Sequence, residues 1–345
     1  MKTTSPTIFQ KFFRKIGLDF GSSRIRVCSE TEGILIDQPA CIAVDSSSGQ
    51  VIAVGKDAAA MSGRVDPKII IHWPIRNGVL YDATTAGALL KVVLQPILRS
   101  ALLYGPVMMV SVPGGSTENQ RESMSSLLYE LGAREVYTIA QPLAASIGAG
   151  VPIADSSGSF VLHLGEGVVE AAVISLGTMV ECQSNWYGGA FLKQQIKLAV
   201  NTERKLQISQ ATAQLLLHSI ATVKPDEGGE LLITGKDAAT RSPKEIKISA
   251  QTLQVPVASM VKRAERSIQQ LLSQIPPELT VDIIDKGLLL SGGLAQLQSL
   301  DSYLIQTLGM PVAVIDEPDL AVIKGIETAL QHLDEFKESL SSLGE

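Results

Sequence analysis

Short apolar runs alternate with longer segments of helical spacing along most of the chain. The apolar runs have the length and composition of β-strands: Ile34–Ile36, Val51–Val54, Val107–Val112, Val136–Ile139, Phe160–Leu164, Glu170–Ser175, Leu288–Leu290 and Val312–Val314. The helical segments are Thr85–Leu103, Thr117–Leu131, Gln141–Gly150, Ala190–Leu206, Gln210–Val223, Thr252–Ile275 and Leu320–Leu333. Strands that alternate with helices predict an α/β fold. The segment Asp226–Ser249 differs, and two short strands followed by a polar loop with Pro243 predict a small inserted subdomain.

One strand–turn–strand pattern occurs twice. Ile16–Val27 reads IGLDFGSSRIRV, and Phe160–Ile174 reads FVLHLGEGVVEAAVI. Each has an apolar strand, a glycine-bearing turn and a second strand. In each, the residue two positions before the first glycine of the turn is at an equivalent place. Backbone N–H groups of such turns approach phosphate oxygens closely, and a neighbouring carboxylate organises Mg²⁺ and its waters. The first copy has Asp19 at that place and the second has His163, so the second copy lacks the acid.

Composition narrows the class of protein. A chain of 345 residues with 45% hydrophobic and 19% charged residues is globular and large enough for more than one subdomain. Its net charge of −6 argues against nucleic acid as a main partner. The spacing of Cys28, Cys41 and Cys182 favours buried reduced thiols over a metal site or disulfide. We find no apolar run long enough to span a membrane, and no secretory signal.

These hairpins, in this order, resemble the actin and heat-shock-chaperone ATPase superfamily, and within it the MreB-like bacterial actins. Further MreB-like stretches are Ala53–Asp82, VSVPGGSTENQRES, Leu131–Gly150, Pro276–Leu304 and the closing helix after Asp316. The resemblance implies two lobes of duplicated ribonuclease-H-like α/β cores with two smaller inserted subdomains, and ATP between the lobes. In the first lobe, the resemblance implies a subdomain IA at 16–36 and 74–150 and a subdomain IB at 37–73. In the second lobe, it implies a subdomain IIA at 151–190 and 250–333 and a subdomain IIB at 191–249. A membrane anchor at 1–15 and a tail at 334–345 complete the chain.

The first turn contains the candidate catalytic acid. The resemblance implies that Asp19 holds Mg²⁺ through water and that Gly21, Ser22 and Ser23 bind phosphate; the ordinary alternative is a strand-end Asp that caps its own turn. Arg24 replaces a small polar residue, and either pairs with a phosphate or pairs with Glu166. Gln141 stands where the family positions the attacking water. A Gln orients water but cannot accept its proton, and a polar helix cap is the alternative.

The second turn departs further from the family pattern. His163 cannot serve as a second acid, and Glu166, between Gly165 and Gly167, repels phosphate unless a cation lies between them. Val168 and Val169 supply no hydroxyl group. The other nucleotide-binding candidates that the resemblance implies are Gly188, Gly189, Gln214, Leu217, Gly292, Gly293, Leu294 and Ala295. Ala190 replaces a family Asp, and Leu294 replaces a glycine. Leu217 stands where the family has a polar side chain, and core packing is its alternative role.

The changes gather on the positions that would bind ATP. We therefore expect ATP or ADP with Mg²⁺ as the cofactor, with altered binding, and hydrolysis that is weak or lost. The resemblance implies a cytoskeletal protein that forms double filaments and acts in cell shape. An active ATPase switch and a non-polymerising adaptor of a true MreB are the alternatives. A sugar kinase of the same superfamily is a weaker alternative, because the chain lacks a general-base Asp and a large sugar-binding insertion.

Two apolar segments are candidate membrane contacts. Ile8, Phe9, Phe12 and Phe13 share one helical face, with basic residues on the other, which is typical of an interfacial anchor. Leu102 and Leu103 fall where the family has a membrane-inserting loop; core packing is the alternative. We expect a peripheral protein on the inner face of the cytoplasmic membrane. Its expected partners are further copies of the chain, an MreB paralogue and cell-shape membrane proteins, but not nucleic acid.

Overall fold

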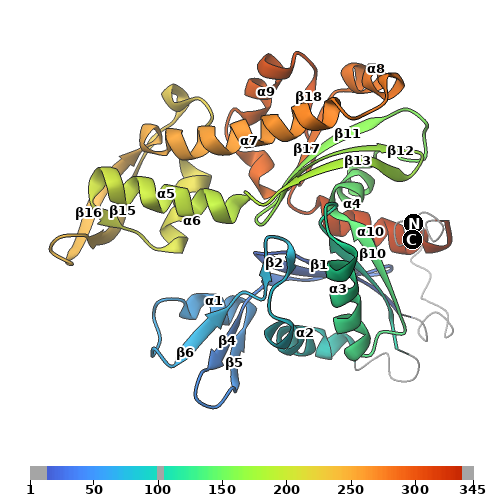
Figure 1. Cartoon of the computed structure of the whole chain (residues 1–345). Coiled ribbons are helices and arrows are strands. Elements are labelled where there is room, and N and C mark those ends of the chain that lie inside the picture. The colour runs from blue at the N-terminus through green and yellow to red at the C-terminus, as the bar shows by residue number, and fades with distance from the viewer. Residues whose placement is uncertain (1–13, 99–104, 336–345) are drawn as a thin grey trace. The chain divides into compact units, whose positions relative to one another are not determined.

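The computed structural model describes residues 14–98 and 105–335, which form two compact units. Unit 1 comprises the chain up to Ala154 together with the segment from Leu320, and unit 2 comprises Asp155–Asp319. The candidate membrane residues Ile8, Phe9, Phe12, Phe13, Leu102 and Leu103 lie outside the described residues. Figure 1 labels the helices and strands of each unit.

Unit 1 is built on a five-stranded mixed sheet with the order β10-β9-β1-β2-β3. Its strands are β1 (Lys15–Phe20), β2 (Arg24–Ser29), β3 (Gly33–Pro39), β9 (Val107–Val112) and β10 (Glu135–Ala140). Side chains alternate between the two faces of each strand. Ile16, Leu18 and Phe20 therefore pack in one core with helices α2 (Ala83–Leu98) and α3 (Glu118–Glu130). Asp19 belongs to the opposite face, together with Gly17.

Helices α4 (Gln141–Gly148) and α10 (Ala321–Gln331) pack closely together in unit 1, and α10 also contacts β1, β2 and β9. A Cβ atom on Gly325 would lie 1.7 Å from the Ala144 carbonyl oxygen, and one on Gly148 would lie 2.0 Å from the Ala321 carbonyl oxygen. Only glycine allows the two backbones to approach this closely. The expectation that the closing helix belongs to the second lobe, as part of 250–333, is wrong: the chain returns to unit 1.

A smaller sheet, with the order β5-β4-β6, completes the first half of the chain. It contains β4 (Ile42–Asp45), β5 (Val51–Val54) and β6 (Ile69–His72), and the short helix α1 (Gly55–Met61) packs beside it. A two-stranded ribbon, β7 (Ile75–Arg76) and β8 (Val79–Leu80), leads to α2. The predicted start of α3 is confirmed, because Thr117 and Gln120 form a reciprocal capping box.

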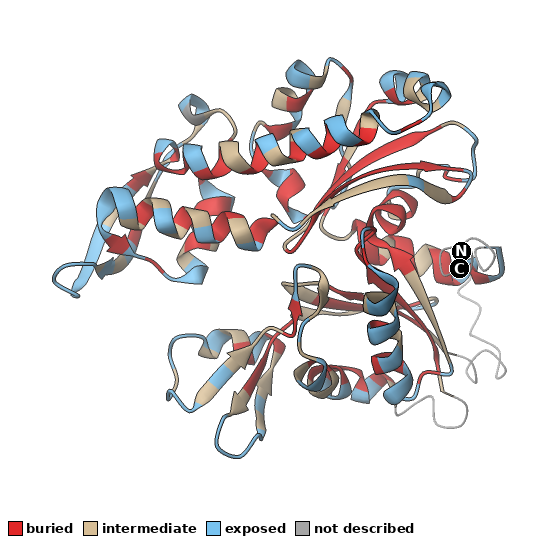
Figure 2. Ribbon diagram, viewed as in Figure 1, coloured by how far each residue is buried: buried red, intermediate tan, exposed pale blue. Residues whose placement is uncertain are grey.

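Unit 2 is built on a second five-stranded sheet with the order β13-β12-β11-β17-β18. Its strands are β11 (Ser159–Leu164), β12 (Val169–Ser175), β13 (Thr178–Asn185), β17 (Leu288–Ser291) and β18 (Val312–Val314). Helices α7 (Gln254–Leu272), α8 (Pro277–Lys286) and α9 (Leu300–Leu308) contribute to its core. Figure 2 shows β11 and β12 buried almost throughout their length.

The rest of unit 2 contains α5 (Gly189–Arg204), α6 (Gln210–Ser219) and a three-stranded sheet. Its strands are β14 (Leu206–Gln207), β15 (Glu230–Asp237) and β16 (Pro243–Ser249). The insertion therefore has the order strand, loop, strand, and Pro243 begins β16 instead of lying in a terminal loop. Sequence analysis also missed α1, α8, α9 and β13, because short or half-exposed elements show too few periods for a clear pattern.

The two large sheets have the same topology. In each, a hairpin and its third strand lie on one side, and two later parallel strands lie on the other. Strands β1, β2, β3, β9 and β10 correspond to β11, β12, β13, β17 and β18. This correspondence confirms the predicted duplicated α/β cores. Apart from the corrected end of the second lobe, the boundaries of four subdomains within the two units stay predictions.

Candidate functional site

The two glycine-bearing turns are closed in the same way. The Gly21 N–H donates to the Arg24 carbonyl oxygen at 2.9 Å, and the Gly165 N–H donates to the Val168 carbonyl oxygen at 2.8 Å. Both turns join the first two strands of their sheets, as the repeated sequence pattern predicts. The second turn therefore keeps the backbone geometry of the first although most of its side chains differ.

One row of four residues crosses each sheet beside its turn. In unit 1 the strand registers align Asp19 with Arg26 and Arg26 with Asp37, and Ser111 lies next to Asp19 on the other side. In unit 2 they align His163 with both Ser291 and Glu170, and Glu170 with Ser184. The unit 1 row is therefore Ser, Asp, Arg, Asp, and the unit 2 row is Ser, His, Glu, Ser.

Both carboxylate oxygens of Asp19 have a partner within unit 1. Ser111 Oγ donates to Oδ1 at 2.9 Å, and Arg26 Nη1 lies 3.5 Å from Oδ2. Asp19 and Arg26 are 8% and 6% exposed, so the pair is largely removed from water. Burial raises the pKa of Asp19, and the charge of Arg26 and the Ser111 hydrogen bond oppose that increase.

Arg24 and Arg26 share a second acid, Asp37. Arg24 Nε lies 2.6 Å from Asp37 Oδ1, and Arg26 Nε lies 3.3 Å from the same atom. Sequence analysis considered a phosphate or Glu166 as the partner of Arg24 and did not identify Asp37. The signal was present in the alternation of β2 and β3, but the register that pairs them was not assigned.

The other unit 1 candidates surround the first turn. The Gly78 N–H donates to Ser22 Oγ at 2.9 Å, and the Ala40 N–H donates to the Ser23 carbonyl oxygen at 2.9 Å. Gln141 is the first residue of α4 and is 7% exposed. The N-cap of this helix is Ala140, which has no side-chain cap hydrogen bond, and the roles predicted for Gln141 stay predictions. The turn is thus held by the chain's own hydrogen bonds.

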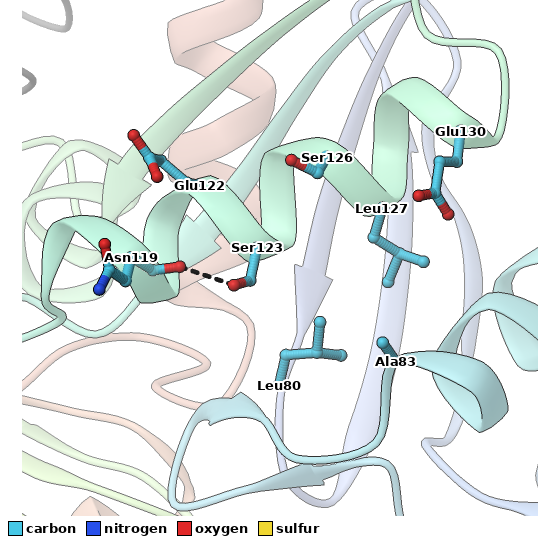
Figure 3. Close-up of a pocket in the computed structure, with 8 residues that line it drawn as sticks. All are labelled: Leu80, Ala83, Asn119, Glu122, Ser123, Ser126, Leu127 and Glu130. Carbon is cyan, nitrogen blue, oxygen red and sulfur yellow. Dashed lines mark hydrogen bonds between the residues drawn. The ribbon is translucent and has the colours of Figure 1, made fainter.

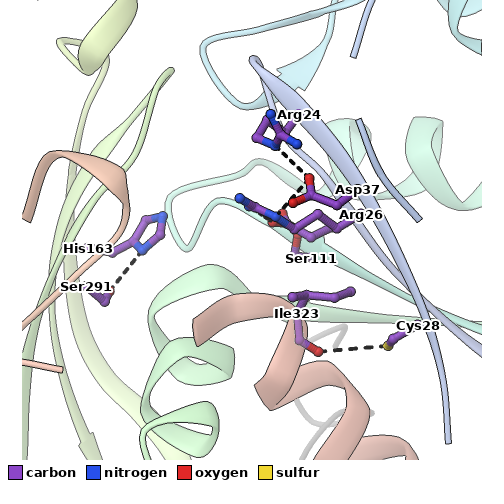
Figure 4. Close-up of polar contacts among 9 residues, drawn as sticks. Arg24, Arg26, Cys28, Asp37, Ser111, His163, Ser291 and Ile323 are labelled. Atoms are coloured by element: carbon purple, nitrogen blue, oxygen red, sulfur yellow. Dashed lines mark hydrogen bonds and ion pairs between the residues drawn. The ribbon is translucent and has the colours of Figure 1, made fainter. Parts of the chain in front are cut away.

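His163 is a buried neutral imidazole. It is 6% exposed, and its Nδ1 lies 3.0 Å from Ser291 Oγ (Figure 4). Burial lowers the pKa of His163 to about 4, because desolvation disfavours the charged ring. The side chain at the position equivalent to Asp19 therefore carries no charge at neutral pH. Next to it, the fully buried Glu170 accepts a hydrogen bond from Ser184 Oγ.

Glu166 has a cation beside it that the sequence motifs do not include. Lys193 Nζ lies 2.7 Å from Glu166 Oε1 and donates to Gln214 Oε1 at 2.6 Å. Lys193 is 5% exposed and lies one turn into α5, whereas Glu166 is partly exposed. The structure thus brings together two predicted residues, Glu166 and Gln214, through a third that the sequence analysis missed. The repulsion expected from Glu166 is reduced because its charge is balanced.

The glycine pair before α5 packs against the second turn. The Gly189 N–H donates to the Gly165 carbonyl oxygen at 3.0 Å, and the Ala190 N–H donates to the Glu166 carbonyl oxygen at 2.9 Å. A Cβ atom on Gly188 would lie 2.5 Å from both of those carbonyl oxygens. These contacts explain Gly188 as a requirement of backbone packing, whereas a Cβ atom on Gly189 would meet the carboxylate of the Glu166 side chain at 2.6 Å. The two hydrogen bonds also satisfy N–H groups that a helix start otherwise leaves without partners.

The glycine loop after β17 has no room for a side chain at Gly292 but has room for one at Gly293. Gly292 has φ +84° and donates to the Pro318 carbonyl oxygen at 2.7 Å, and a Cβ atom there would lie 2.4 Å from the Leu164 carbonyl oxygen. No atom lies within 4 Å of a Cβ atom built on Gly293, which is exposed. The other candidates have side chains in the apolar core of unit 2: Val169, Leu217, Leu294 and Ala295. The core alternative for Leu217 therefore matches its burial.

A separate pocket of about 440 Å³ lies on unit 1, along α3 (Figure 3). Leu80 and Ala83 form one side, and Glu122, Leu127 and Glu130 are among the α3 residues on the other. None of the residues predicted from the glycine turns lines it. Its open form and mixed lining do not identify a ligand, and the glycine turns remain the candidate site.

The residues present do not fit Mg²⁺ well. This ion prefers oxygen ligands and their bound waters. Both oxygens of Asp19 already have partners, and the equivalent position in unit 2 holds an imidazole. Within residues 14–98 and 105–335, no group of three or more His, Cys, Asp or Glu side chains could hold a metal ion. The predicted water-mediated metal role of Asp19 is thus disfavoured by its contacts.

Solved structures share the fold over nearly the whole chain. MreB5 of Spiroplasma citri bound to ADP superimposes with a TM-score of 0.90 at 26% identity, covering 95% of this chain and 99% of that one. The MamK double helical filament structure, at 16% identity, has a TM-score of 0.76 over 93% of this chain and 98% of that one. The chain therefore has the actin-like ATPase fold.

Sequence comparison gives the family. The cell shape-determining protein Mbl of Bacillus subtilis is 32% identical over 332 residues, which is 96% of this chain and 100% of that protein. The cell shape-determining protein MreB of Escherichia coli K12 is 32% identical over 333 residues, 94% of this chain and 95% of that protein. The model of the MreB/Mbl protein family matches residues 13–338. With the duplicated sheets and their paired glycine turns, this match means that the chain belongs to the MreB/Mbl family.

Proposed function

We propose that this chain is a cytoskeletal subunit that assembles into filaments and takes part in determining cell shape. The observation that carries the proposal is the full-length match to Mbl and MreB, whose names describe them as cell shape-determining proteins. The actin-like fold, which a filament-forming protein also has, supports self-assembly as the mode of action. Copies of the chain itself are the first expected partners, and an MreB paralogue is the second.

Nucleotide binding is the second element of the proposal. MreB5 of Spiroplasma citri has been solved with ADP and with AMPPNP. The present chain keeps a glycine in each of the two turns and an open backbone at Gly293. We propose that backbone N–H groups of these turns bind the phosphates, because such groups need no particular side chain. ADP or ATP is the expected ligand.

Hydrolysis is proposed to be weak or lost. The His163 imidazole cannot supply the second acid, and Asp19 is engaged with Ser111 and Arg26. Gln141 can orient a water molecule but has no group that accepts its proton at neutral pH. Loss of general-base catalysis typically costs about 10²–10⁴-fold in rate. Assembly would then depend on nucleotide binding alone, or on no nucleotide.

Membrane association is the third element of the proposal. No helix among the described residues is long and apolar enough to cross a membrane. The amphipathic segment that includes Phe9 and Phe12 would place the filament at the inner face of the cytoplasmic membrane. Many weak anchors aligned along one filament bind more tightly than one anchor alone. Deletion of residues 1–12 should reduce co-sedimentation with anionic liposomes, and unchanged binding would refute this element.

Electron microscopy of the protein on a lipid monolayer, with and without ATP, tests assembly directly. Filaments in both conditions would support assembly that is uncoupled from turnover. Filaments only with ATP would favour the alternative of an active ATPase switch, and ATP hydrolysis that Asp19→Ala abolishes would establish it. A protein that stays monomeric in both conditions yet binds an MreB would favour the adaptor alternative and contradict the main proposal.

A further inference from the structure

Two basic side chains lie beside the acids of the two turns, although neither belongs to a predicted nucleotide motif. Arg26 contacts Asp19 and Asp37 in unit 1, and Lys193 contacts Glu166 in unit 2. Arg26 and Lys193 are 6% and 5% exposed. Buried charges need counterions at short range, because separating such a pair leaves a charge that neither water nor protein compensates. Both pairs are therefore fixed parts of the folded units.

We propose that Arg26 in unit 1 and Lys193 in unit 2 each neutralise the acid beside the turn of their own unit, so that neither turn recruits Mg²⁺ when the chain binds a nucleotide. The inference rests on the proposed nucleotide binding and adds how the charge at that site is balanced. It concerns only residues within each unit, and each unit carries its own cation.

The contacts of Asp19 provide the first argument. A metal ion or its water at Asp19 would have to share the carboxylate with the guanidinium at Oδ2 and the hydroxyl at Oδ1, and the guanidinium is itself a cation. Arg26 has little exposure to water, so losing this contact would leave its charge buried. The protein's own cation is always present at high effective concentration, whereas Mg²⁺ must also lose water to bind.

The balance of charge provides the second argument. Arg24 and Arg26 carry as much formal charge as Asp19 and Asp37, with which they form ion pairs. In unit 2, Lys193 balances Glu166. Neither cluster has the net negative charge that concentrates a divalent cation. The turns can therefore present N–H groups to phosphate without a metal to screen the acids.

The first experiment measures ADP binding to the full chain by calorimetry, in buffer with Mg²⁺ and in buffer with EDTA. We expect dissociation constants that differ by less than about threefold, a small difference on the affinity scale. If ADP affinity falls by about tenfold or more when Mg²⁺ is removed, the inference is overturned, while the proposed nucleotide binding stays intact. No ADP binding in either buffer would instead refute the nucleotide binding on which the inference rests.

The second experiment uses Mn²⁺ alone as a probe, followed by electron paramagnetic resonance. Arg26→Ala leaves Asp19, Asp37 and the Ser111 hydroxyl around the space of the lost guanidinium. Oxygen atoms of this kind are ligands for hard divalent cations. We expect Arg26→Ala to bind about one Mn²⁺ that raises its melting temperature, and the unmodified chain to bind none at that affinity.

The matched control is Arg24→Ala, which removes an arginine from the same turn. Arg24 pairs with Asp37 but not with Asp19, so this variant should gain no Mn²⁺ binding. If the unmodified chain itself binds one Mn²⁺ and Asp19→Asn abolishes that binding, Asp19 is a metal site and the inference is wrong. If Arg26→Ala fails to fold, the calorimetric comparison on the unmodified chain still decides.

Discussion

The row of residues beside the first turn and the row beside the second occupy the same places in two sheets of the same topology, yet their chemistry differs. In unit 1, Asp19 and Asp37 lie on either side of Arg26, and three charges alternate along the row. In unit 2, His163 is neutral and hydrogen-bonded to Ser291, and Glu170 accepts from Ser184. One backbone arrangement thus supports an ion-pair network in one unit and, in the other, a row in which a neutral imidazole occupies the place of Asp19.

The comparison teaches that backbone and side-chain functions separate in this fold. The turn hydrogen bonds at Gly21 and Gly165 are nearly identical. They depend only on backbone geometry, so replacement of the neighbouring acid by histidine leaves them unchanged. The charge near each turn depends instead on the cross-strand partner, and it can be tested residue by residue.

Arg26→Leu should have the largest effect on stability. The substitution leaves Asp19 buried without its cation, and removing one member of a buried ion pair costs about 3–5 kcal/mol of unfolding free energy. Arg24→Leu should cost less than about 1 kcal/mol, because that pair is roughly one-third exposed and is screened by water. Urea denaturation at neutral pH measures both variants. Equal losses would mean that burial does not distinguish the two arginines.

Protonation of His163 should make the protein less stable in acid. Its pKa is lowered from 6.5 to about 4, so the unfolded chain binds more protons between these values. The contribution is fully present above pH 6.5 and is lost as the pH falls toward 4, by up to about 3 kcal/mol. Denaturation followed over this range should show the loss, and His163→Asn should remove most of it. An unchanged pH profile in the variant would show that the imidazole is not the titrating group.

Asp19 should show the opposite dependence. Its pKa is raised in the folded chain, so the folded state holds its proton more strongly. The associated stability is present below the unfolded value and is lost as the pH rises through the folded value. Asp19→Asn, compared with His163→Asn, should therefore change the pH profile of stability with opposite sign.

A methyl group should be tolerated differently within the first turn and against the second. Gly188→Ala places a Cβ atom 2.5 Å from the carbonyl oxygens of Gly165 and Glu166, which overpacks the second turn and should cost about 2–3 kcal/mol. Gly21→Ala meets only the Arg24 carbonyl oxygen, at 3.4 Å, and should change stability by less than about 1 kcal/mol. Thermal unfolding measures the stability of both variants. A larger loss of stability for Gly21→Ala than for Gly188→Ala would contradict this prediction.

The two serines should report the charge of their partners. Ser111 donates to the carboxylate of Asp19, and a hydrogen bond to a charged group is worth about 1.5–3 kcal/mol. Ser291 lies against a neutral imidazole, so its hydrogen bond is worth about 1 kcal/mol. Ser111→Ala should therefore lose more stability than Ser291→Ala in matched denaturation curves. Equal losses would indicate that Asp19 is protonated in the folded chain.

Much of the fold follows from local patterns. The apolar runs Phe160–Leu164 and Val107–Val112 predict strands that the structure contains, and the bounds of the first differ by one residue. The helical segment predicted from Thr117 begins where expected, and the structure adds that Thr117 and Gln120 form a local capping box there. The placement of α10 did not follow, because its contact with α4 depends on glycines far apart in the chain.

The candidate site was only partly predictable. The turns around Gly21 and Gly165 were found because a glycine between two apolar strands is a local signal. Arg26 and Lys193 were missed, because a basic residue in a strand or helix has no distinctive local pattern. Their roles appear only when β2 is paired with β1 and β3, and when α5 is packed against the second turn.

The repeated hairpin, its glycine turns and the exchange of Asp for His can be identified from local sequence, because strand patterns and glycine's backbone freedom act over a few neighbouring residues. The partners that balance each charge follow from long-range contacts. Ser111 reaches Asp19 across 92 positions of the chain, and Ser291 reaches His163 across 128. Burial and ion pairing depend on the residues that surround a group in space, and folding alone brings those residues together.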